Sequence, residues 1–374
     1  MSLKEFLDHK TMFYEKIDYE CIEKSYEQLQ EHIQLPYVIH IIGTNGKGST
    51  GRFLASFLHQ NNKSVLHYSS PHILKFNERI WIDGSNSSDS DLEQAHQKLQ
   101  VILDKKYLDQ LTYFEYTTLL AIVLGSGKEY LVFEAGLGGE FDATNVVKND
   151  VSVLTTIGLD HQDFLGDTIE AITATKVRSC DKTIFVSYQE YDIVYKTVYE
   201  TLVNKEIFEV RNIQPQIDYK MYEISEYLQR NLHTVFCLLS YLGFPIKQYQ
   251  LPKLFGRFES LSPNIIIDVG HNPLAALAIS KELKKDTQKY ILIYNSYKDK
   301  DFSKNLQLLS DVIKKVLIIE IDDKRIVDKK VLQTTLDRLS LQYEDFSIEK
   351  LESREKYLVF GSFLVVENFL KQYG

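Results

Sequence analysis

The chain of 374 residues has little cysteine, no long hydrophobic run and no internal repeat. Its three cysteines, Cys21, Cys180 and Cys237, lack the spacing of a metal or redox site, so we expect reduced, packed thiols. The apolar runs are too short to span a bilayer, and the charged N-terminus MSLKEFLDHK lacks the apolar core of a signal peptide. These absences predict a globular cytoplasmic protein that does not associate with membranes.

Positive charge is also scarce: 43 Lys and Arg residues stand against 52 Asp and Glu residues, a formal net charge of −9. This balance argues against a nucleic-acid partner. It also means that an anionic substrate must be bound by local cations or metal ions, because the chain as a whole repels it. The length suits two domains, each large enough to bury a core.

The most informative segment that is present is Gly43–Thr50, which reads GTNGKGST. It follows the apolar run Tyr37–Ile42, a predicted buried strand, and precedes a predicted helix that begins near Ser49. Backbone N–H groups of such a loop, the helix N-terminus and Lys47 suit the phosphates of ATP or GTP. The loop differs from an ordinary P-loop by the extra Gly48 between lysine and hydroxyl. The alternative is a tight turn with a surface lysine.

Strand-like and helix-like runs alternate along the chain, which predicts an α/β fold with parallel sheets covered on both faces. In the first half we expect strands at 37–42, 64–68, 130–134, 151–156 and 183–187. The pattern breaks around 251–259, and we place the domain boundary near Phe255–Leu261. In the second half we expect strands at 264–269, 290–294, 316–321 and 357–360, a helix at 273–284 and a last helix to about residue 371.

Polar clusters follow several of these strands, at the sheet edge where α/β proteins bind ligands. Ser70 follows the strand at 64–68 and suits magnesium or phosphate, with Arg79 nearby as an anion ligand; a proline-containing loop is the alternative. Glu134 ends its strand before a glycine-rich turn, which favours Mg²⁺ and close backbone approach to a ligand. His161 follows a third strand at the same edge.

Other candidates are ambiguous from residue type alone. The aromatic block Thr112–Glu115 suits a flat heterocycle, but aromatic residues at a helix start more often belong to the core. Lys176 has the alternative of a solvated helical lysine, and Lys298–Asp301 that of a solvated loop.

In the second half, Asn272 and Pro273 suit a helix N-cap and first helical position. That leaves Asp268 and His271 for function, with Asp268 suited to ribose hydroxyls. Arg257 at the domain junction suits phosphates.

Taken in order, the motifs resemble the folylpolyglutamate synthase/dihydrofolate synthase family, a branch of the Mur ligase superfamily. The resemblance runs from about residue 38 to about residue 365. It rests on GTNGKGST, SSPH with NERI, LTYFEY, EAGLGGEFDATN, GLDHQDFLGDT, GRFE, DVGHNP and the Gly361-Ser-Phe stretch.

The resemblance implies a role for each matching residue. Its implied ATP contacts are Thr44, Asn45, Gly46, Lys47, Gly48, Ser49, Asn231, Arg257 and Asp268. Its implied magnesium ligands are Ser70, Glu134 and His161. Its implied dihydropteroate pocket is Thr112, Tyr113, Phe114 and Glu115 with Phe141, Asp142 and Ala143. The residues expected to act in catalysis are Lys47, His161, His271 and Lys176, and Lys176 matches a lysine that the family carries as N6-carboxylysine.

The chain departs from the family pattern in two places. Family members usually carry arginine where this chain has Glu140, which reverses a charge beside the pteroate pocket. The lysine matched by Lys176 is normally followed by Ala-Gly-Ile, whereas here Val-Arg-Ser follows. The segment Tyr188–Glu226 matches little of the pattern.

The implied activity is an ATP-dependent, Mg²⁺-dependent amide ligase that acts through an acyl phosphate. It adds L-glutamate to dihydropteroate and to the glutamate tail of tetrahydrofolate. A monofunctional folylpolyglutamate synthase, a Mur-type peptide ligase and a P-loop nucleotide switch are the alternatives. The expected architecture is a P-loop-type domain at 1–256 and a smaller Rossmann-like domain at 257–374, in a monomer whose partners are small-molecule substrates.

Overall fold

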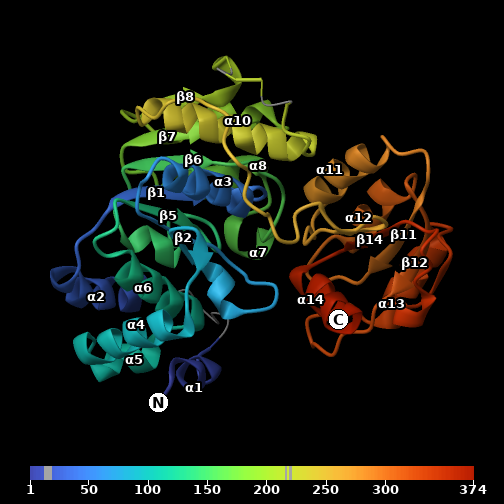
Figure 1. The fold of residues 1–374 in the computed structure, drawn as a ribbon, viewed down its shortest axis with the longest axis horizontal. Helices are drawn as coiled ribbons and strands as arrows, with labels where there is room; N and C mark the ends of the chain where they lie inside the picture. Colours follow the sequence, from blue (N-terminus) through green and yellow to red (C-terminus); the bar gives the residue numbers. More distant parts are fainter. Residues whose placement is uncertain (12–18, 215–216, 219–220) are drawn as a thin grey trace. The chain divides into compact units, whose positions relative to one another are not determined.

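The structure is a computed structural model that describes residues 1–11, 19–214, 217–218 and 221–374. These residues form two compact units, each with its own sheet (Figure 1). Unit 1 comprises Met1–Glu223 and Leu228–Pro252, and unit 2 comprises Ile224–Tyr227 and Lys253–Gly374. The domain division at 256 and 257 remains a prediction. Nothing in the sequence pattern indicated that Ile224–Tyr227 belongs with the second unit.

The sheet of unit 1 has eight strands among the described residues. Their order is β4 (Ser85–Asn86), β3 (Ile80–Ile82), β2 (Val65–Tyr68), β5 (Tyr130–Glu134), β1 (Tyr37–Ile42), β6 (Val151–Leu154), β7 (Thr183–Val186) and β8 (Glu206–Glu209). Strands β2, β5, β1, β6, β7 and β8 are parallel, while β3 and β4 are antiparallel. Apart from β8 at the end of the sheet, the parallel strands are mostly apolar and buried, because helices cover both faces.

Helices connect these strands and pack on both faces of the sheet. They are α1 (Leu3–Asp8), α2 (Tyr19–Leu29), α3 (Lys47–Gln60), α4 (Asp89–Ile102), α5 (Lys105–Gln110), α6 (Tyr113–Gly125), α7 (Gln162–Leu165), α8 (Ile169–Val177), α9 (Asp192–Thr201) and α10 (Glu226–Tyr241). Helix α3 lies against β1, β2 and β5. Short 3₁₀ turns lie at η1 (Gln30–His32), η2 (Phe76–Arg79), η3 (Ala143–Val146) and η4 (Val210–Asn212).

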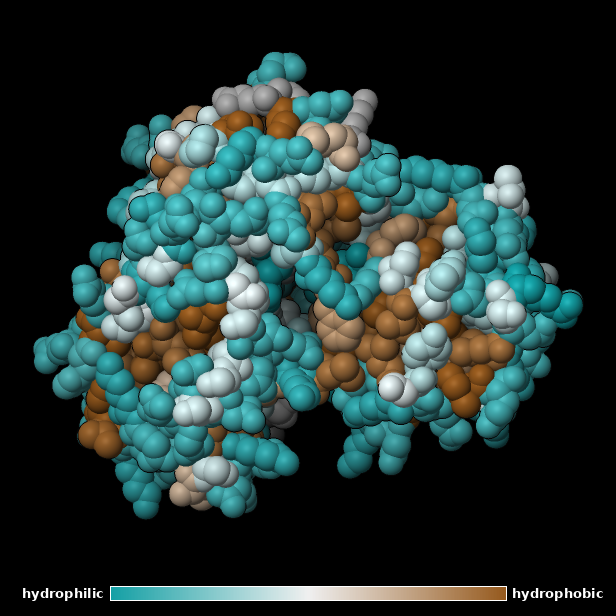
Figure 2. Space-filling model, viewed as in Figure 1, coloured by the Kyte–Doolittle hydropathy of each residue, from teal (hydrophilic) through white to brown (hydrophobic). Residues whose placement is uncertain are grey.

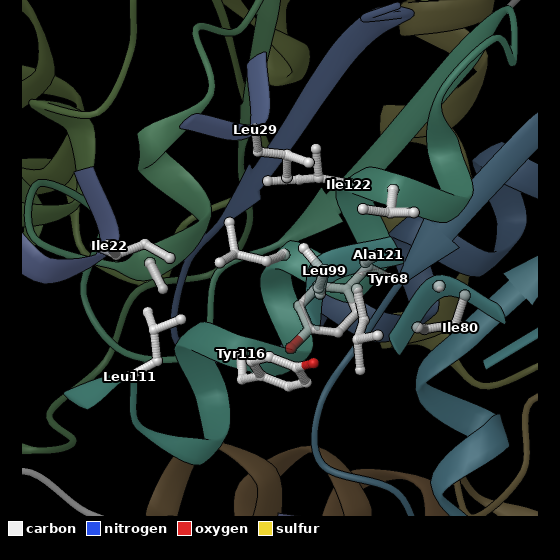
Figure 3. Packing of buried hydrophobic residues seen from close by; sticks show 14 of the residues in the cluster. Ile22, Leu29, Tyr68, Ile80, Leu99, Leu111, Tyr116, Ala121 and Ile122 are labelled. Atoms are coloured by element: carbon white, nitrogen blue, oxygen red, sulfur yellow. The ribbon is translucent and has the colours of Figure 1, made fainter. Parts of the chain in front are cut away.

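The largest core of unit 1 lies between the sheet and helices α2, α4 and α6. Figure 3 shows Ile22 and Leu29 from α2 and Leu99 from α4 directed toward Tyr116 of α6 and Tyr68 of β2. All five side chains are fully or almost fully buried. Burying a large apolar side chain contributes about 1.5–3 kcal/mol, so this core holds the strands, and hence the loops that follow them, in fixed register.

The sheet of unit 2 has six strands in the described residues. Their order is β13 (Tyr343–Asp345), β12 (Ile313–Ile318), β11 (Tyr290–Tyr294), β14 (Tyr357–Phe360), β10 (Ile265–Ile267) and β9 (Glu259–Ser262), with only β9 antiparallel. Its helices are α11 (Pro273–Leu283), α12 (Phe302–Leu309), α13 (Lys329–Arg338) and α14 (Phe363–Tyr373), with a 3₁₀ turn at η6 (Ile348–Lys350). The predicted α/β class and two-sheet organisation are confirmed.

Several strand predictions have the observed bounds, namely 37–42, 130–134, 290–294 and 357–360. The strand expected at 316–321 begins earlier, at Ile313, because β11 pairs with it from there. The sheets are mainly parallel, as expected, and the sequence pattern did not indicate the antiparallel strands β3, β4 and β9. These edge strands are only two to four residues long and too short to show a period.

The face shown in Figure 2 is mainly hydrophilic, with hydrophobic patches between the hydrophilic residues. Isolated exposed hydrophobic residues are normal for a folded protein. Across the described ranges, no helix combines the length and the apolar character that membrane spanning needs. The three cysteines are free and buried, as the sequence led us to expect.

Candidate active site

Three loops of unit 1 leave neighbouring strands at the same edge of the sheet. Strand β1 pairs with β5 on one side and β6 on the other. The loops that follow carry residues 43–46, 135–142 and 155–161. Because parallel strands end together, this topology brings the predicted ATP loop beside Glu134 and the segment that leads to His161.

Backbone hydrogen bonds fix the ATP loop against the loop after β6. The amides of Thr44 and Asn45 both donate to the carbonyl of Thr156, at 3.0 and 3.1 Å. The Thr44 hydroxyl donates to the Gly158 carbonyl at 3.1 Å and accepts from the Gly158 amide at 3.1 Å. The loop therefore has a defined shape before any ligand binds.

Gly46 has a left-handed backbone, with φ of 89°, and stands at the N-cap of α3. A Cβ on Gly46 would lie 3.0 Å from Oδ1 of Asn231, so the Asn231 side chain lies against the loop. No side chain caps the first turn of α3. Its N–H groups, which lack partners within the helix, are thus available to an anion.

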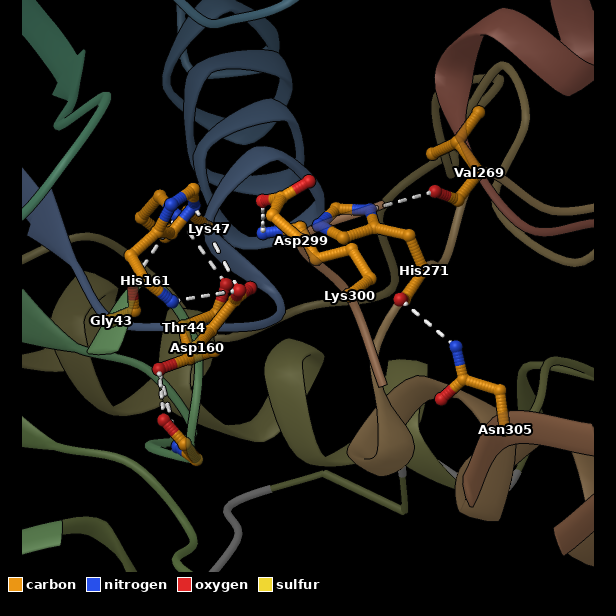
Figure 4. A network of polar contacts seen from close by, with 11 residues as sticks. Gly43, Thr44, Lys47, Asp160, His161, Val269, His271, Asp299, Lys300 and Asn305 are labelled. Carbon is orange, nitrogen blue, oxygen red and sulfur yellow. Dashed lines mark hydrogen bonds and ion pairs between the residues drawn. The ribbon is translucent and has the colours of Figure 1, made fainter. Parts of the chain in front are cut away.

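Lys47 begins α3 and turns its ammonium back over the loop. Its Nζ donates to the carbonyls of Gly43 and Thr44 at 3.2 and 3.4 Å (Figure 4). The same Nζ lies 4.0 Å from Oε1 of Glu134, and both side chains are mostly buried. The structure thus brings together the predicted phosphate-binding cation and the predicted metal-binding carboxylate.

His161 and Ser70 follow other strands of this sheet. His161 stands at the N-cap of α7 with φ of 52°, its amide donates to Asp160 at 2.9 Å, and its Nε2 lies 3.9 Å from the Asp160 carboxylate. Ser70 follows β2, which pairs with β5. In the part of the chain that the structure describes, no three His, Cys, Asp or Glu side chains form a metal cluster. The predicted metal set contains only two residues of those types, Glu134 and His161.

Lys176 is buried in α8, which makes its ammonium form costly. Burial, and then the nearby positive charge of Lys47, lower the pKa of Lys176 to about 7, while Asp142 and Asp160 oppose the shift. A substantial fraction of the amine is therefore neutral near pH 7. The alternative of a solvated helical lysine is wrong, since the residue is only 5% exposed.

The aromatic block divides into a helix cap and two rings. Thr112 and Glu115 form a capping box at the start of α6: Glu115 Oε2 accepts from both the amide and the hydroxyl of Thr112, at 2.8 Å each. Tyr113 lies under the Arg79 guanidinium, 5.2 Å away. Phe114 lies so close to Gly136 that a Cβ there would approach its ring to 2.6 Å.

The segment Phe141–Ala143 shapes the glycine-rich turn after β5. Asp142 is buried and accepts from the amide of Leu137 at 2.7 Å and from the amide and hydroxyl of Thr144 at 3.0 and 2.6 Å. Burial raises the pKa of Asp142, and these hydrogen bonds oppose the shift. Ala143 is buried, whereas Phe141 is 54% exposed and meets the Tyr19 ring edge-on at 6.3 Å.

In unit 2 the carboxylate of Asp268 bridges two loops. Its Oδ1 accepts from the Gly270 amide at 2.7 Å, and its Oδ2 accepts from the Phe258 amide at 2.8 Å and the Tyr227 hydroxyl at 3.1 Å. Burial raises the pKa of Asp268, and Arg257 opposes the shift. The Arg257 guanidinium stacks on the Phe363 ring, with 5.1 Å between them.

His271 and Asn272 lie at the start of α11. His271 contacts the Val269 carbonyl through Nδ1 at 3.2 Å, and its own carbonyl accepts from the Asn305 amide at 3.0 Å (Figure 4). Asn272 caps the helix by accepting from the Ala275 amide at 3.0 Å, and Pro273 is the first helical residue, so both local predictions are confirmed. In the Lys298–Asp301 segment, Asp301 caps α12.

Several residues that support the site have no signal in the local sequence. Thr156 and Gly158 hold the ATP loop, and Tyr227 holds Asp268, through contacts between distant parts of the chain. No local pattern signals such contacts. The capping box was readable, because a threonine followed three residues later by glutamate before an apolar run is its signature.

Comparison with known proteins agrees with this geometry. The sequence pattern of the Mur ligase middle domain matches residues 41–192. The dihydrofolate synthase/folylpolyglutamate synthase of Haemophilus influenzae is 31% identical over 395 residues, which cover 90% of this chain and 88% of that protein. The Escherichia coli protein of the same name is 31% identical over 305 residues, which cover 74% and 71%.

A solved structure extends the similarity to the whole fold. The crystal structure of Helicobacter pylori folylpolyglutamate synthetase is 39% identical, with a TM-score of 0.80, and the match covers 99% of this chain and 97% of that one. The order of the sequence motifs, the two-sheet fold and the similarity to these relatives all indicate the same family. The chain belongs to the dihydrofolate synthase/folylpolyglutamate synthase family.

Proposed function

We propose that this protein is an ATP-dependent ligase that adds L-glutamate to dihydropteroate and to the glutamate tail of tetrahydrofolate. Family membership supports the proposal. The observation that carries it is the ammonium of Lys47, 4.0 Å from the Glu134 carboxylate beside an uncapped helix N-terminus. This arrangement suits phosphoryl transfer, in which positioning and charge stabilisation do most of the catalysis.

In the proposed reaction the acceptor carboxylate attacks the γ-phosphorus of ATP, which gives an acyl phosphate and ADP. Lys47 and the N–H groups of the 43–49 segment stabilise the charge that develops on the phosphate oxygens. The α-amine of L-glutamate then attacks the activated carbonyl. An amide forms, and phosphate leaves with the electron pair of the broken C–O bond. Thr44, Asn45, Gly46, Gly48, Ser49 and Asn231 are the proposed nucleotide contacts in unit 1.

The residues present fit a magnesium ion. Mg²⁺ takes one or two carboxylate ligands and keeps several waters, so the absence of a larger acidic cluster among the described residues agrees with the proposed ligands Ser70, Glu134 and His161. When bound, the ion would draw negative charge from the phosphate oxygens. The negative charge of the Glu134 carboxylate lies 4.0 Å from the Lys47 ammonium and balances its positive charge.

Lys176 also suits carbamylation, in which the neutral amine reacts with CO₂. Because its pKa is about 7, a substantial fraction of Lys176 is in this neutral form near pH 7. We propose that it carries an N6-carboxyl group and supplies a carboxylate toward the metal. In ¹³C-bicarbonate, the wild-type protein should show a carbamate ¹³C signal that K176R lacks. An unchanged signal in K176R would remove this part of the proposal.

Unit 2 supplies the remaining proposed nucleotide contacts. The Arg257 guanidinium, supported by the Phe363 ring, would bind phosphate oxygens, and Asp268 would bind ribose hydroxyls. His271 is a proposed catalytic residue whose loop is fixed by Asn305. Asp268 already accepts three hydrogen bonds, so its second contribution is to hold Phe258 and Gly270 in place.

The acceptor pocket is proposed at Tyr113, Phe114, Phe141, Asp142 and Ala143, with Thr112 and Glu115 supporting it as the cap of α6. Flat rings such as Tyr113 and Phe114 suit a pterin. A folylpolyglutamate synthase that acts only on tetrahydrofolate is the second candidate, because the Helicobacter pylori relative bears that name alone. The monomeric state and the cytoplasmic location remain predictions.

One experiment tests the function directly. Purified protein receives Mg²⁺, ATP and L-glutamate, and phosphate release is measured with dihydropteroate, with tetrahydrofolate or without acceptor. We expect glutamate-dependent release with both acceptors. Release with tetrahydrofolate alone would establish the second candidate, and release that ignores both glutamate and acceptor would overturn the ligase.

A further inference from the structure

The glycine-rich turn after β5 bears proposed acceptor-pocket residues, yet its own backbone is intrinsically free. Gly136, Gly138 and Gly139 precede Glu140, and Gly138 has a φ of 79°. Glycine loses more conformational freedom on folding than any other residue. Besides the hydrogen bond from the Leu137 amide to Asp142, contacts with other segments hold this turn next to Phe141, which is 54% exposed.

Those contacts lead to the C-terminal end of α8. The Glu140 amide donates to the Thr175 carbonyl at 3.1 Å. Gly139 lies so close to Lys176 that a Cβ would come within 2.3 Å of the Lys176 carbonyl oxygen. The Glu140 carbonyl accepts from the Asn145 amide at 3.0 Å. The turn and the helix that carries Lys176 are thus in direct backbone contact.

An ion pair closes the same junction. Nη1 of Arg178 lies 3.0 Å from Oε2 of Glu140, with side-chain exposures of 52% and 30%. Arg178 is the C-cap residue of α8. Glu140 is one departure from the family pattern noted in the sequence, and Arg178 belongs to the other, the Val-Arg-Ser segment after Lys176; the structure pairs the two side chains with each other.

We propose that Glu140 and Arg178 are a positioning pair that fixes the acceptor pocket, which takes a flat heterocycle ending in a carboxylate. The pair attaches the turn to α8 and so sets Phe141 and Asp142 relative to Lys176. Within the pair, Arg178 neutralises the Glu140 carboxylate, whose negative charge would otherwise repel the anionic acceptor. The inference rests on the proposed function.

Removing either partner separates the two effects. R178A leaves an unneutralised carboxylate beside the pocket, so the KM for the acceptor should rise about three- to fivefold, the size expected for a partly exposed ion pair. E140A loses the attachment but leaves no negative charge, so its rise should be smaller, about twofold. The double exchange E140R/R178E restores the pair and should return the KM to within about twofold of wild type.

Lys182 offers a matched control. Its Nζ forms an ion pair with Asp150 at 2.6 Å, with side-chain exposures of 65% and 26%, and it joins the segments before β6 and β7. K182A therefore removes a comparable ion pair from the same unit. We expect K182A to leave the KM for the acceptor unchanged and R178A to leave the KM for ATP unchanged. If R178A lowers Tm, R178Q carries the same test, because it keeps a polar side chain at this position but also leaves the Glu140 carboxylate without its cation.

The outcomes distinguish the two levels of proposal. A wild-type protein that shows no glutamate-dependent phosphate release with either acceptor would refute the proposed function. A wild-type protein that is active while R178A matches K182A in acceptor KM would refute the positioning pair alone. Failure of E140R/R178E to recover, with its Tm unchanged, would do the same.

Discussion

Two turns of this protein both connect a strand to a helix, but only one of the two helices is capped by a side chain. In unit 1, β1 passes through Gly46 into α3, and in unit 2, β10 passes through Asn272 into α11. The Gly46 position offers no side-chain cap, whereas the Asn272 side chain accepts from the Ala275 amide. One helix start is left open and has a lysine at its first residue. The other is closed by its own sequence.

The difference shows that a strand, a turn and a helix do not by themselves make an anion site. What matters is whether the chain satisfies the first N–H groups of the helix itself. In α11 it does, so the neighbouring functional candidates must act through their side chains. In α3 it does not, and Lys47 and Glu134 lie in front of the opening.

The largest expected effect is at the open turn. K47A should lower kcat by about a hundredfold to a thousandfold, because a buried charged donor to the phosphates is lost. Phosphate release with tetrahydrofolate as acceptor measures it. K63A is the control, since Lys63 forms an exposed ion pair with Glu129 in the same unit. Near-normal turnover in K47A would show that the uncapped start of α3 does not bind the reacting phosphate, and the proposed difference between the two turns would be wrong.

The second expected effect concerns the buried amine near the open turn. The pKa of Lys176 is about 7 in the folded protein and near 10.5 when the chain unfolds, so between these values only the unfolded state holds the proton. The stability of the wild type should therefore rise with pH from about 7 to about 10, by at most about 1.4 kcal/mol per unit.

K176M should remove that slope. Urea denaturation at several pH values, in buffer free of bicarbonate, measures it. K182M should keep the slope, because the hydrogen bond and ion pair with Asp150 raise the pKa of Lys182, the opposite direction to the shift at Lys176. An identical slope in wild type and K176M would show that Lys176 is solvated in solution.

A smaller effect separates backbone strain from nucleotide binding. G46A and G127A both place a Cβ on a left-handed backbone, with φ of 89° and 77°, and each should cost about 1–2 kcal/mol of stability. A Cβ at Gly127 meets nothing within 4 Å, whereas one at Gly46 meets Asn231 at 3.0 Å. Only G46A should raise the KM for ATP, by about tenfold. Equal ATP kinetics in both variants would mean that the loop shape is irrelevant to the nucleotide.

The smallest expected effect is at the closed turn. N272A should lower the free energy of unfolding by about 1 kcal/mol through loss of the cap, and N272D should restore it. S362A, which uncaps α14 in the same unit, provides the matched loss. Activity of N272A should change no more than that of S362A. A far larger loss of activity in N272A would reveal a ligand at the start of α11 and erase the contrast between the turns.

Much of this picture follows from local sequence. Their apolar residues are enough to predict that Tyr37–Ile42 and Tyr130–Glu134 are buried parallel strands. The helix cap at Asn272 and Pro273 can also be predicted from local sequence. Glu134 ends one predicted strand and the loop to Lys47 follows another, so the two side chains lie close together once these parallel strands are neighbours.

The remainder depends on contacts across the chain. The short edge strands β3 and β4 are defined by pairing and not by periodicity. Glu140 and the Val-Arg-Ser segment after Lys176 are unrelated departures in the sequence, whereas the fold sets Glu140 and Arg178 3.0 Å apart. The turn folded against α8 likewise places Gly139 against the backbone of Lys176, a contact that the immediate sequence neighbours of Lys176 do not indicate.

The brief excursion of Ile224–Tyr227 into unit 2 matters to anyone who wishes to dissect the protein. A gene fragment that starts at Lys253 would encode the whole second sheet but omit Tyr227. The Asp268 carboxylate would then lose the phenol that donates to it at 3.1 Å, one of its three hydrogen bonds. The two units are therefore not joined simply end to end, because unit 2 includes Tyr227, which lies within the stretch of sequence that otherwise forms unit 1.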